Sequence, residues 1–191
     1  MALTSGLGGQ LSIDLGALAR NWRALDKVSA GALTAAVVKA DAYGIGIDKA
    51  SKALHAAGAR FFFVATPDEG MAVRAAVPDA HIFILYGLYP GAANLYIRQN
   101  LMPVLSSMSM LEEWMAKCIE RNEAYPAAFH FDTGINRLGF RLNEASLVRE
   151  SIEKLGYAPQ MVMSHLACAD TPEHEHNTYQ LGRFNSAWRS L

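Results

Sequence analysis

The chain has 191 residues, of which 51% are apolar, and this composition fits a folded protein with one sizeable core and excludes intrinsic disorder. Lys and Arg number 17 and Asp and Glu 18, so the net charge of -1 excludes the basic surface typical of nucleic-acid-binding proteins. No apolar run approaches the roughly 20 residues that span a bilayer. The first ten residues lack the basic and apolar regions of a signal peptide. We therefore expect neither a nucleic-acid nor a membrane partner.

Short apolar runs alternate with amphipathic stretches along the whole chain. Each run has the length of a buried strand, and successive runs are separated by the length of one βα unit. Two architectures explain this alternation: a doubly wound open sheet, or a (β/α)8 barrel of which about six units are present. Periodicity alone leaves both open. The predicted strands cover 34–40, 61–65, 81–86, 101–105, 127–131 and 160–165.

The first half of the chain carries three helix signals between these strands. A helix is predicted after Asp14, and a second is predicted to be capped by Asp48 and to end at Gly58. Thr66 and Glu69 have the spacing of a capping box, with proline at the first helical position.

The second half carries three more. Ser109 and Glu112 predict another capping box, and Asn143 is predicted to open a helix that stops at Gly156. Apolar residues at helical spacing over 181–191 predict a final helix.

Neither cysteines nor histidines form a metal-binding pattern. Cys118 and Cys168 match no redox or zinc spacing, which is consistent with a reducing cytoplasm. His174 and His176 belong to no zinc helix, because Thr178 stands where the second histidine of that motif belongs. We expect no metal, and we place these histidines in a loop before the last helix.

Lys39 has the most informative position in the sequence. It follows the first predicted strand directly and precedes a turn that contains Gly44. The carboxyl end of a barrel strand is where βα enzymes keep their chemistry, and a desolvated lysine amine there can form a Schiff base with a carbonyl compound. The alternative is a solvent-exposed lysine at a strand end, and spacing alone leaves both open.

Four segments resemble alanine racemases in order and separation. Residues 36–44 (AVVKADAYG) resemble the family's pyridoxal-phosphate lysine motif, and residues 131–140 (FDTGINRLGF) resemble its Asp-Thr-Gly-x-x-Arg-Leu-Gly segment. Residues 164–170 (SHLACAD) resemble its His-x-Ala-x-Ala-Asp segment, and residues 11–18 (LSIDLGAL) resemble its start. This resemblance covers nearly the whole chain and implies an α/β fold, an incomplete (β/α)8 TIM barrel of about six units.

The resemblance also implies roles for five residues. Lys39 would form the Schiff base with pyridoxal 5'-phosphate and act as the acid/base group on the D-alanine face. Tyr43 would donate a hydrogen bond to the cofactor phosphate, and Leu85 would line the cofactor wall. Arg137 would contact the phenolic oxygen of the cofactor and position the substrate carboxylate. His165 would lie beside the pyridine ring. For Tyr43 and Leu85, ordinary packing is the alternative interpretation.

The activity that the resemblance implies is the racemisation of L-alanine and D-alanine. It implies a cytoplasmic homodimer that acts on a small amino acid and supplies D-alanine for peptidoglycan. We expect residues 1–191 to be a truncated N-terminal barrel domain without the C-terminal β-domain. The tyrosine that serves as the second base lies in that domain, so the chain alone is expected to be inactive.

One departure from the family pattern concerns His130. Many family members have a lysine there, which can be carbamylated to hold the arginine seven residues later, and a histidine forms no such stable carbamate. The sequence therefore leaves open how Arg137 is held. Three alternative functions also stay open: a racemase of another amino acid, a non-catalytic pyridoxal-phosphate protein of the same fold, and a structural fragment that binds nothing.

Overall fold

A computed structural model describes residues 11–191, so the segment on which the signal-peptide expectation depends lies outside the described residues. The described part contains one parallel sheet of six strands and eight α-helices that follow or precede them. The strands are β1 (Ala36–Val37), β2 (Phe61–Val64), β3 (His81–Ile84), β4 (Leu101–Leu105), β5 (Ala128–His130) and β6 (Met161–Met163). The helices are α1 (Leu15–Val28), α2 (Lys39–Gly44), α3 (Ile47–Ala57), α4 (Pro67–Ala76), α5 (Ala93–Gln99), α6 (Met108–Arg121), α7 (Ala145–Glu153) and α8 (Glu175–Arg189), with a 3₁₀ turn at Leu142–Glu144.

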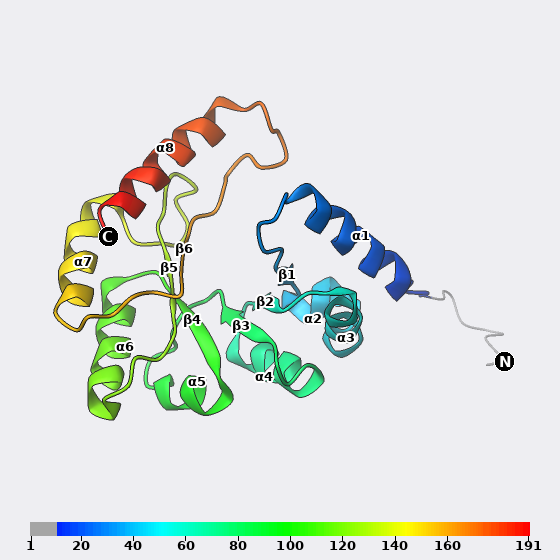
Figure 1. Ribbon diagram of the computed structural model, residues 1–191, viewed down its shortest axis with the longest axis horizontal. Helices are drawn as coiled ribbons and strands as arrows, with labels where there is room; N and C mark the ends of the chain where they lie inside the picture. Colours follow the sequence, from blue (N-terminus) through cyan, green and yellow to red (C-terminus); the bar gives the residue numbers. More distant parts are fainter. Residues whose placement is uncertain (1–10) are drawn as a thin grey trace.

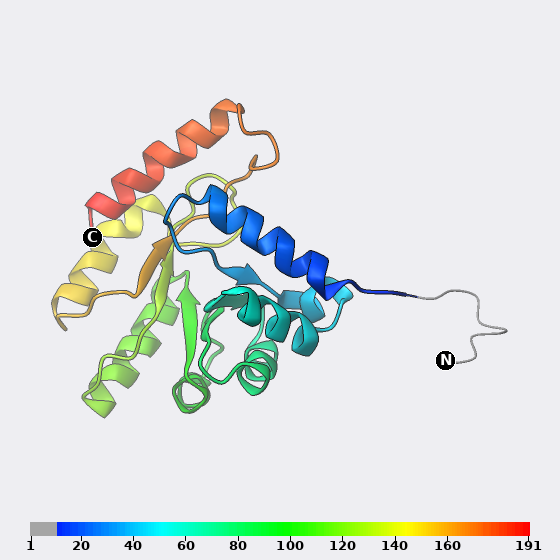
Figure 2. The same cartoon turned by 45° about the vertical axis from the view of Figure 1, so that its right-hand side comes forward.

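The strand order distinguishes between the two architectures. Neighbouring strands in space are neighbours in sequence, in the order β1-β2-β3-β4-β5-β6, and every pair is parallel. A doubly wound sheet would reverse its direction at a switch point, and this sheet has none within the described residues. Figures 1 and 2 show the strands curving around a common axis with α3 to α7 on the outside. The predicted incomplete barrel is therefore confirmed, with β1 and β6 as its outer strands.

Side chains alternate between the two faces of this curved sheet. Residues such as Phe62, Val64, Ile82 and Ile84 point outward, where the helices bury them completely. Their sequence neighbours form a separate, smaller cluster on the concave inner face, in which the rings of Phe63 and Phe83 stack with centroids 4.8 Å apart. The rest of the inner cluster comprises Phe61, Leu85, Met102, Val104, Ala128, Met161 and Met163.

The helix predicted after Asp14 and the predicted capping box of Thr66 and Glu69 are both confirmed. The Asp14 side chain accepts a hydrogen bond from the backbone N–H of Ala17 at 2.9 Å, at the start of α1. At the start of α4, Thr66 and Glu69 form the predicted capping box. In both cases one short polar side chain accepts from a backbone N–H that no helical carbonyl can reach.

The predicted first residues of three helices were wrong by one or two positions. Gly46, not Asp48, caps α3, and Asp48 lies in its first turn. Ser107, not Ser109, caps α6, because its hydroxyl accepts from Met110 at 3.4 Å. Asn143 lies inside the 3₁₀ turn, and α7 starts after it.

The last helix begins earlier than its apolar pattern indicates. His174 precedes α8 as its N-cap and accepts a hydrogen bond from the backbone N–H of His176. His176 lies in the first turn of α8, so its placement in a loop was wrong. α5 is a further element that the sequence did not indicate. No helix in the part of the chain that the structure describes is long and apolar enough to cross a bilayer.

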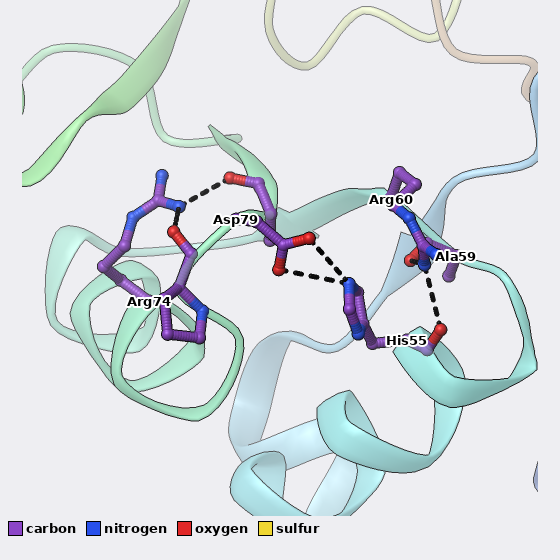
Figure 3. A network of polar contacts seen from close by, with 7 residues as sticks. His55, Ala59, Arg60, Arg74 and Asp79 are labelled. Atoms are coloured by element: carbon purple, nitrogen blue, oxygen red, sulfur yellow. Dashed lines mark hydrogen bonds and ion pairs between the residues drawn. The ribbon is translucent and has the colours of Figure 1, made fainter.

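Arg74 binds backbone carbonyls at the amino end of the sheet, and Figure 3 shows its contacts with the segment just before β3. Its guanidinium donates to the carbonyls of Pro78 and Ala80 at 2.8 and 2.7 Å, just before β3. It also donates to the carbonyls of Gln99 and Asn100 at 3.2 and 2.6 Å, just before β4. In (β/α)8 barrels the amino ends of the strands contribute to stability, and the catalytic residues lie at the carboxyl ends. We therefore assign the contacts of Arg74 a structural role.

An ion pair lies beside Arg74 in the same view. Nε2 of His55 lies 3.2 and 3.3 Å from the two carboxylate oxygens of Asp79, and Arg60 donates to the carbonyls of His55 and Ala59 at 2.9 Å (Figure 3). These contacts join the end of α3 to the segment before β3. Exposed pairs of this kind contribute little stability individually, so we assign them no function.

Candidate functional site

The carboxyl ends of the strands carry four of the candidate site residues. Val38 is 1% exposed beneath the helices, and its N–H donates to the Phe63 carbonyl at 2.9 Å, so the ladder between β1 and β2 continues up to Val38. Lys39 follows directly as the first residue of α2. His130 ends β5, and His165 lies two residues after Met163, the β6 partner of His130. Leu85 and His130 therefore lie on the inner face of the sheet, and Lys39 and His165 follow the carboxyl ends of β1 and β6.

Lys39 is the first residue of α2, and the residues that follow it in this short element form a left-handed helical turn. The φ angles of the four residues Ala40–Tyr43 lie between 51° and 56°, although none of them is glycine. Three contacts hold this turn from within: Ala42 N–H donates to Val38 at 2.9 Å, Gly46 N–H donates to the Asp41 carbonyl at 2.9 Å, and Ile47 N–H donates to the Asp41 carboxylate at 2.7 Å. The unusual backbone thus starts at the residue next to Lys39.

The Arg137 loop is a closed excursion between β5 and α7. The chain leaves the sheet at Phe131 and returns at Phe140, where Phe140 N–H donates to the His130 carbonyl at 2.7 Å and Asp132 N–H donates to the Phe140 carbonyl at 2.9 Å. Within the loop, the Asp132 carboxylate accepts from the N–H groups of Gly134 and Asn136. Gly139 has φ of 129°, which only glycine adopts readily, and packs against the backbone of Asp132. Arg137 is exposed on this loop.

Lys39 and Arg137 lie close enough to His165 for their charges to affect its ionisation. The pKa of His165 is lowered by desolvation and then by the positive charges of Arg137 and Lys39. Its imidazole is therefore held neutral near pH 7, and Lys39 and Arg137 supply the basic groups of this neighbourhood. Such a set binds anionic oxygens, with a guanidinium suited to two oxygens at once.

His130 is the one titratable residue of the site that is fully enclosed. It is 5% exposed, and its Nε2 atom has no hydrogen-bond partner among the described residues. Its pKa is lowered from 6.5 to about 4, mainly by burial and also by His165 and Arg137, while the Asp132 carboxylate opposes the shift. The residue is thus a neutral imidazole on the inner face, with one nitrogen directed at no protein acceptor or donor.

Tyr43 and Leu85 lie at the periphery of the candidate site: Tyr43 is exposed, and Leu85 is partly buried. Tyr43 belongs to the left-handed turn after Lys39, and its side chain is 64% exposed. Leu85 follows β3 and packs at the edge of the inner apolar cluster. Both lie at the same end of the sheet as Lys39, and neither position departs from ordinary packing by itself.

Two residues that sequence reasoning missed support this end of the barrel. Gln180 of α8 is 1% exposed, and its amide donates to Thr133 at 3.0 Å and to the His165 carbonyl at 2.9 Å while it accepts from Ala167 at 2.8 Å. It therefore joins the Arg137 loop to the His165 segment. Glu69 was predicted only as a helix cap, yet its carboxylate also accepts from Ala40 N–H, next to Lys39, at 2.7 Å.

Comparison with known proteins agrees with this geometry. A family model for the N-terminal domain of alanine racemase matches residues 13–191. The chain belongs to the alanine racemase N-terminal domain family. Alanine racemase of Rhizobium meliloti (strain 1021) is 48% identical over 176 residues, which are 92% of this chain and 46% of that protein. The biosynthetic alanine racemase of Agrobacterium fabrum is also 48% identical, over 92% of this chain and 45% of its own length.

Solved alanine racemases share the fold of this chain. The crystal structure of alanine racemase from Bartonella henselae with covalently bound pyridoxal phosphate superimposes with a TM-score of 0.88 and 33% identity, over 94% of this chain and 53% of that one. Alanine racemase from Streptomyces coelicolor A3(2) gives a TM-score of 0.83, also at 33% identity, over 93% of this chain and 49% of that one. The chain therefore spans about half the length of the alanine racemases that it matches.

Proposed function

We propose that these 191 residues form the N-terminal, cofactor-binding part of a longer pyridoxal-phosphate-dependent alanine racemase. The observation that carries the proposal is the position of Lys39 just after the carboxyl end of β1, close enough to His165 for its charge to lower the pKa of that imidazole, as Arg137 also does. The family membership of the chain and its likeness to an alanine racemase with covalently bound pyridoxal phosphate support the same assignment.

The groups at this end of the sheet fit such a cofactor chemically. Lys39 supplies a primary amine for covalent attachment to an aldehyde, and Arg137 supplies a guanidinium for anionic oxygens. The enclosed Nε2 of His130 has no hydrogen-bond partner among the described residues, so it is a buried polar atom that the protein contacts leave unsatisfied. When bound, pyridoxal phosphate supplies an electron sink for the negative charge that remains after an amino acid loses its α-proton.

The residues of this chain account for one half of a racemisation. Nζ of Lys39 would remove or return the α-proton from one side of the substrate, which we assign to the D-alanine face. Arg137 would hold the phenolic oxygen of the cofactor and the substrate carboxylate. His165, whose pKa is lowered by burial and by the charges of Arg137 and Lys39, would lie beside the cofactor ring as a neutral imidazole. Tyr43 would bind the cofactor phosphate from the left-handed turn, and Leu85 would contribute an apolar wall.

Racemisation needs a second acid/base group on the opposite side of the substrate. We assign it to a tyrosine beyond residue 191 that is contributed across a homodimer, which accounts for the expected inactivity of the 191-residue chain alone. We further propose a cytoplasmic location and a role in supplying D-alanine for peptidoglycan. These assignments rest on the motifs shared with alanine racemases.

The test begins with pyridoxal phosphate added to the purified chain. We expect a visible absorbance band that Lys39→Ala abolishes and that Lys49→Ala, an exposed lysine of α3, leaves intact. The chain alone should leave L-alanine unracemised, whereas a full-length protein that contains it should produce D-alanine in a coupled oxidase assay. Racemisation by the 191-residue chain, or a full-length Lys39→Ala variant with normal activity, would contradict the proposal.

A further inference from the structure

The turn that follows Lys39 is strained and needs outside support. Left-handed helical geometry is unfavourable for non-glycine L-residues by roughly 1–2 kcal/mol each, and four of them adopt it in succession at Ala40–Tyr43. Backbone of this kind persists only where the surrounding structure holds it, and such segments gather at functional sites. The residue that supplies this support should therefore influence how Lys39 is presented.

Glu69 makes the long-range contact to this turn. One carboxylate oxygen, Oε1, accepts from Ala40 N–H at 2.7 Å, across 29 residues of sequence. The other, Oε2, accepts from Ala65 N–H at 2.7 Å and from Thr66 N–H at 3.2 Å, where β2 leads into α4. A single side chain thus fixes the first amide after Lys39 to the end of the neighbouring strand through hydrogen bonds to a carboxylate, which are among the stronger ones.

We propose that Glu69 is a positioning residue for Lys39: its carboxylate holds the Ala40 amide and so sets the direction in which Nζ of Lys39 meets the aldehyde of pyridoxal phosphate. This inference rests on the proposed function. Glu69 touches neither cofactor nor substrate in this role. The Ala40 amide directly follows the Lys39 carbonyl, so holding it fixes the peptide plane from which the lysine side chain extends.

The chain offers a matched control in the same capping box. Thr66 Oγ1 accepts from Glu69 N–H at 3.4 Å, so Thr66→Ala removes a cap of α4 while the carboxylate keeps its contact with Ala40. Glu69→Gln preserves the volume of the side chain but retains a single acceptor oxygen, which cannot serve both Ala40 and Ala65. If Glu69 only stabilised α4, the two variants would behave alike.

The experiment separates cofactor attachment from cofactor binding. Each variant of the 191-residue chain is incubated with pyridoxal phosphate, and the carbon–nitrogen double bond formed at Lys39 with loss of water is reduced by borohydride and quantified by mass spectrometry. A parallel titration uses 4-deoxypyridoxine 5-phosphate, which lacks the aldehyde. We expect attachment in Glu69→Gln to slow by about tenfold or more, the effect of losing one charge-assisted hydrogen bond, with binding of the aldehyde-free analogue unchanged.

Three results would overturn the proposal. They are a wild-type attachment rate in Glu69→Gln, an equal loss in Thr66→Ala, and an equal loss of attachment and analogue binding in Glu69→Gln. Hydrogen exchange of the Ala40 amide gives a readout that needs no cofactor: it should accelerate in Glu69→Gln and in the shorter Glu69→Asp, and stay protected in Thr66→Ala. If the wild-type chain attaches no cofactor while this exchange pattern holds, the proposed function fails but the contact of Glu69 with the turn is established.

Discussion

Replacement of His130 by phenylalanine should remove the pH dependence of folding stability that arises from the buried imidazole. The imidazole is 5% exposed, and burial lowers its pKa to about 4 in the folded chain. In the unfolded chain the same group has its ordinary pKa near 6.5. Between these values the unfolded state binds a proton that the folded state does not, so acidification favours unfolding.

The size of the effect follows from proton linkage. Stability due to His130 is complete above about pH 7 and falls as the pH drops through 6.5 toward 4, where the loss levels off. For pKa values of 6.5 and about 4, the free energy of unfolding decreases by about 2 kcal/mol at pH 5 and about 3 kcal/mol at pH 4. His165, whose pKa is also lowered, adds a smaller decrease of the same sign that the substitution at His130 leaves in place.

Urea unfolding at pH 7.5 and pH 5 measures this difference directly. The wild-type chain should lose about 2 kcal/mol more between the two pH values than His130→Phe. His130→Asn serves as the control, because it is polar but does not titrate: it should show the same reduced pH dependence whatever its absolute stability. A His130→Phe chain that loses as much stability as the wild type on acidification would refute the argument from burial.

Three further substitutions test other contacts. Gly139→Ala should lower the free energy of unfolding by about 2 kcal/mol or more in urea unfolding, because φ is 129° and a Cβ would collide with the backbone of Asp132; an unchanged midpoint would contradict the assigned close approach. Arg74→Leu should destabilise by about 3 kcal/mol in the same assay, since four carbonyls lose a charged donor, whereas Arg98→Leu on the exposed surface of α5 should have little effect. Gln180→Leu should destabilise by about 2–3 kcal/mol and accelerate hydrogen exchange at Ala167 N–H, which Gln180 holds; retained protection at Ala167 would argue against this link.

Local chemistry made much of the fold predictable. The predicted strand at 101–105 has the bounds of β4, a helix begins directly after Asp14, and Thr66 caps α4 as expected, because each signal lies within a few adjacent residues. Ser107 and Ser109 illustrate the limit of this reasoning. Both are serines at the start of one helix, and their backbone geometry, not their identity, determines which hydroxyl accepts from the helix.

The position of the candidate site could be predicted from the sequence, but the backbone turn and the hydrogen bond that hold Lys39 could not. Lys39 at a strand end could be read from the sequence, and the resemblance supplied Arg137 and His165. The left-handed turn at Ala40–Tyr43 could not be read, because alanine, aspartate and tyrosine give no local signal for positive φ. The same holds for the contact of Glu69 with Ala40, which depends on how α4 packs beside α2 and not on any sequence pattern.

Peptide mapping of the chain after incubation with pyridoxal phosphate and borohydride reduction tests the central claim most directly. The account predicts that the cofactor mass is found on the peptide that contains Lys39, that Lys49 and the other lysines remain unmodified at low cofactor concentration, and that Lys39→Ala carries no cofactor. Modification spread evenly over exposed lysines, with Lys39 no more reactive than the rest, would contradict the assignment of this end of the barrel as a cofactor site.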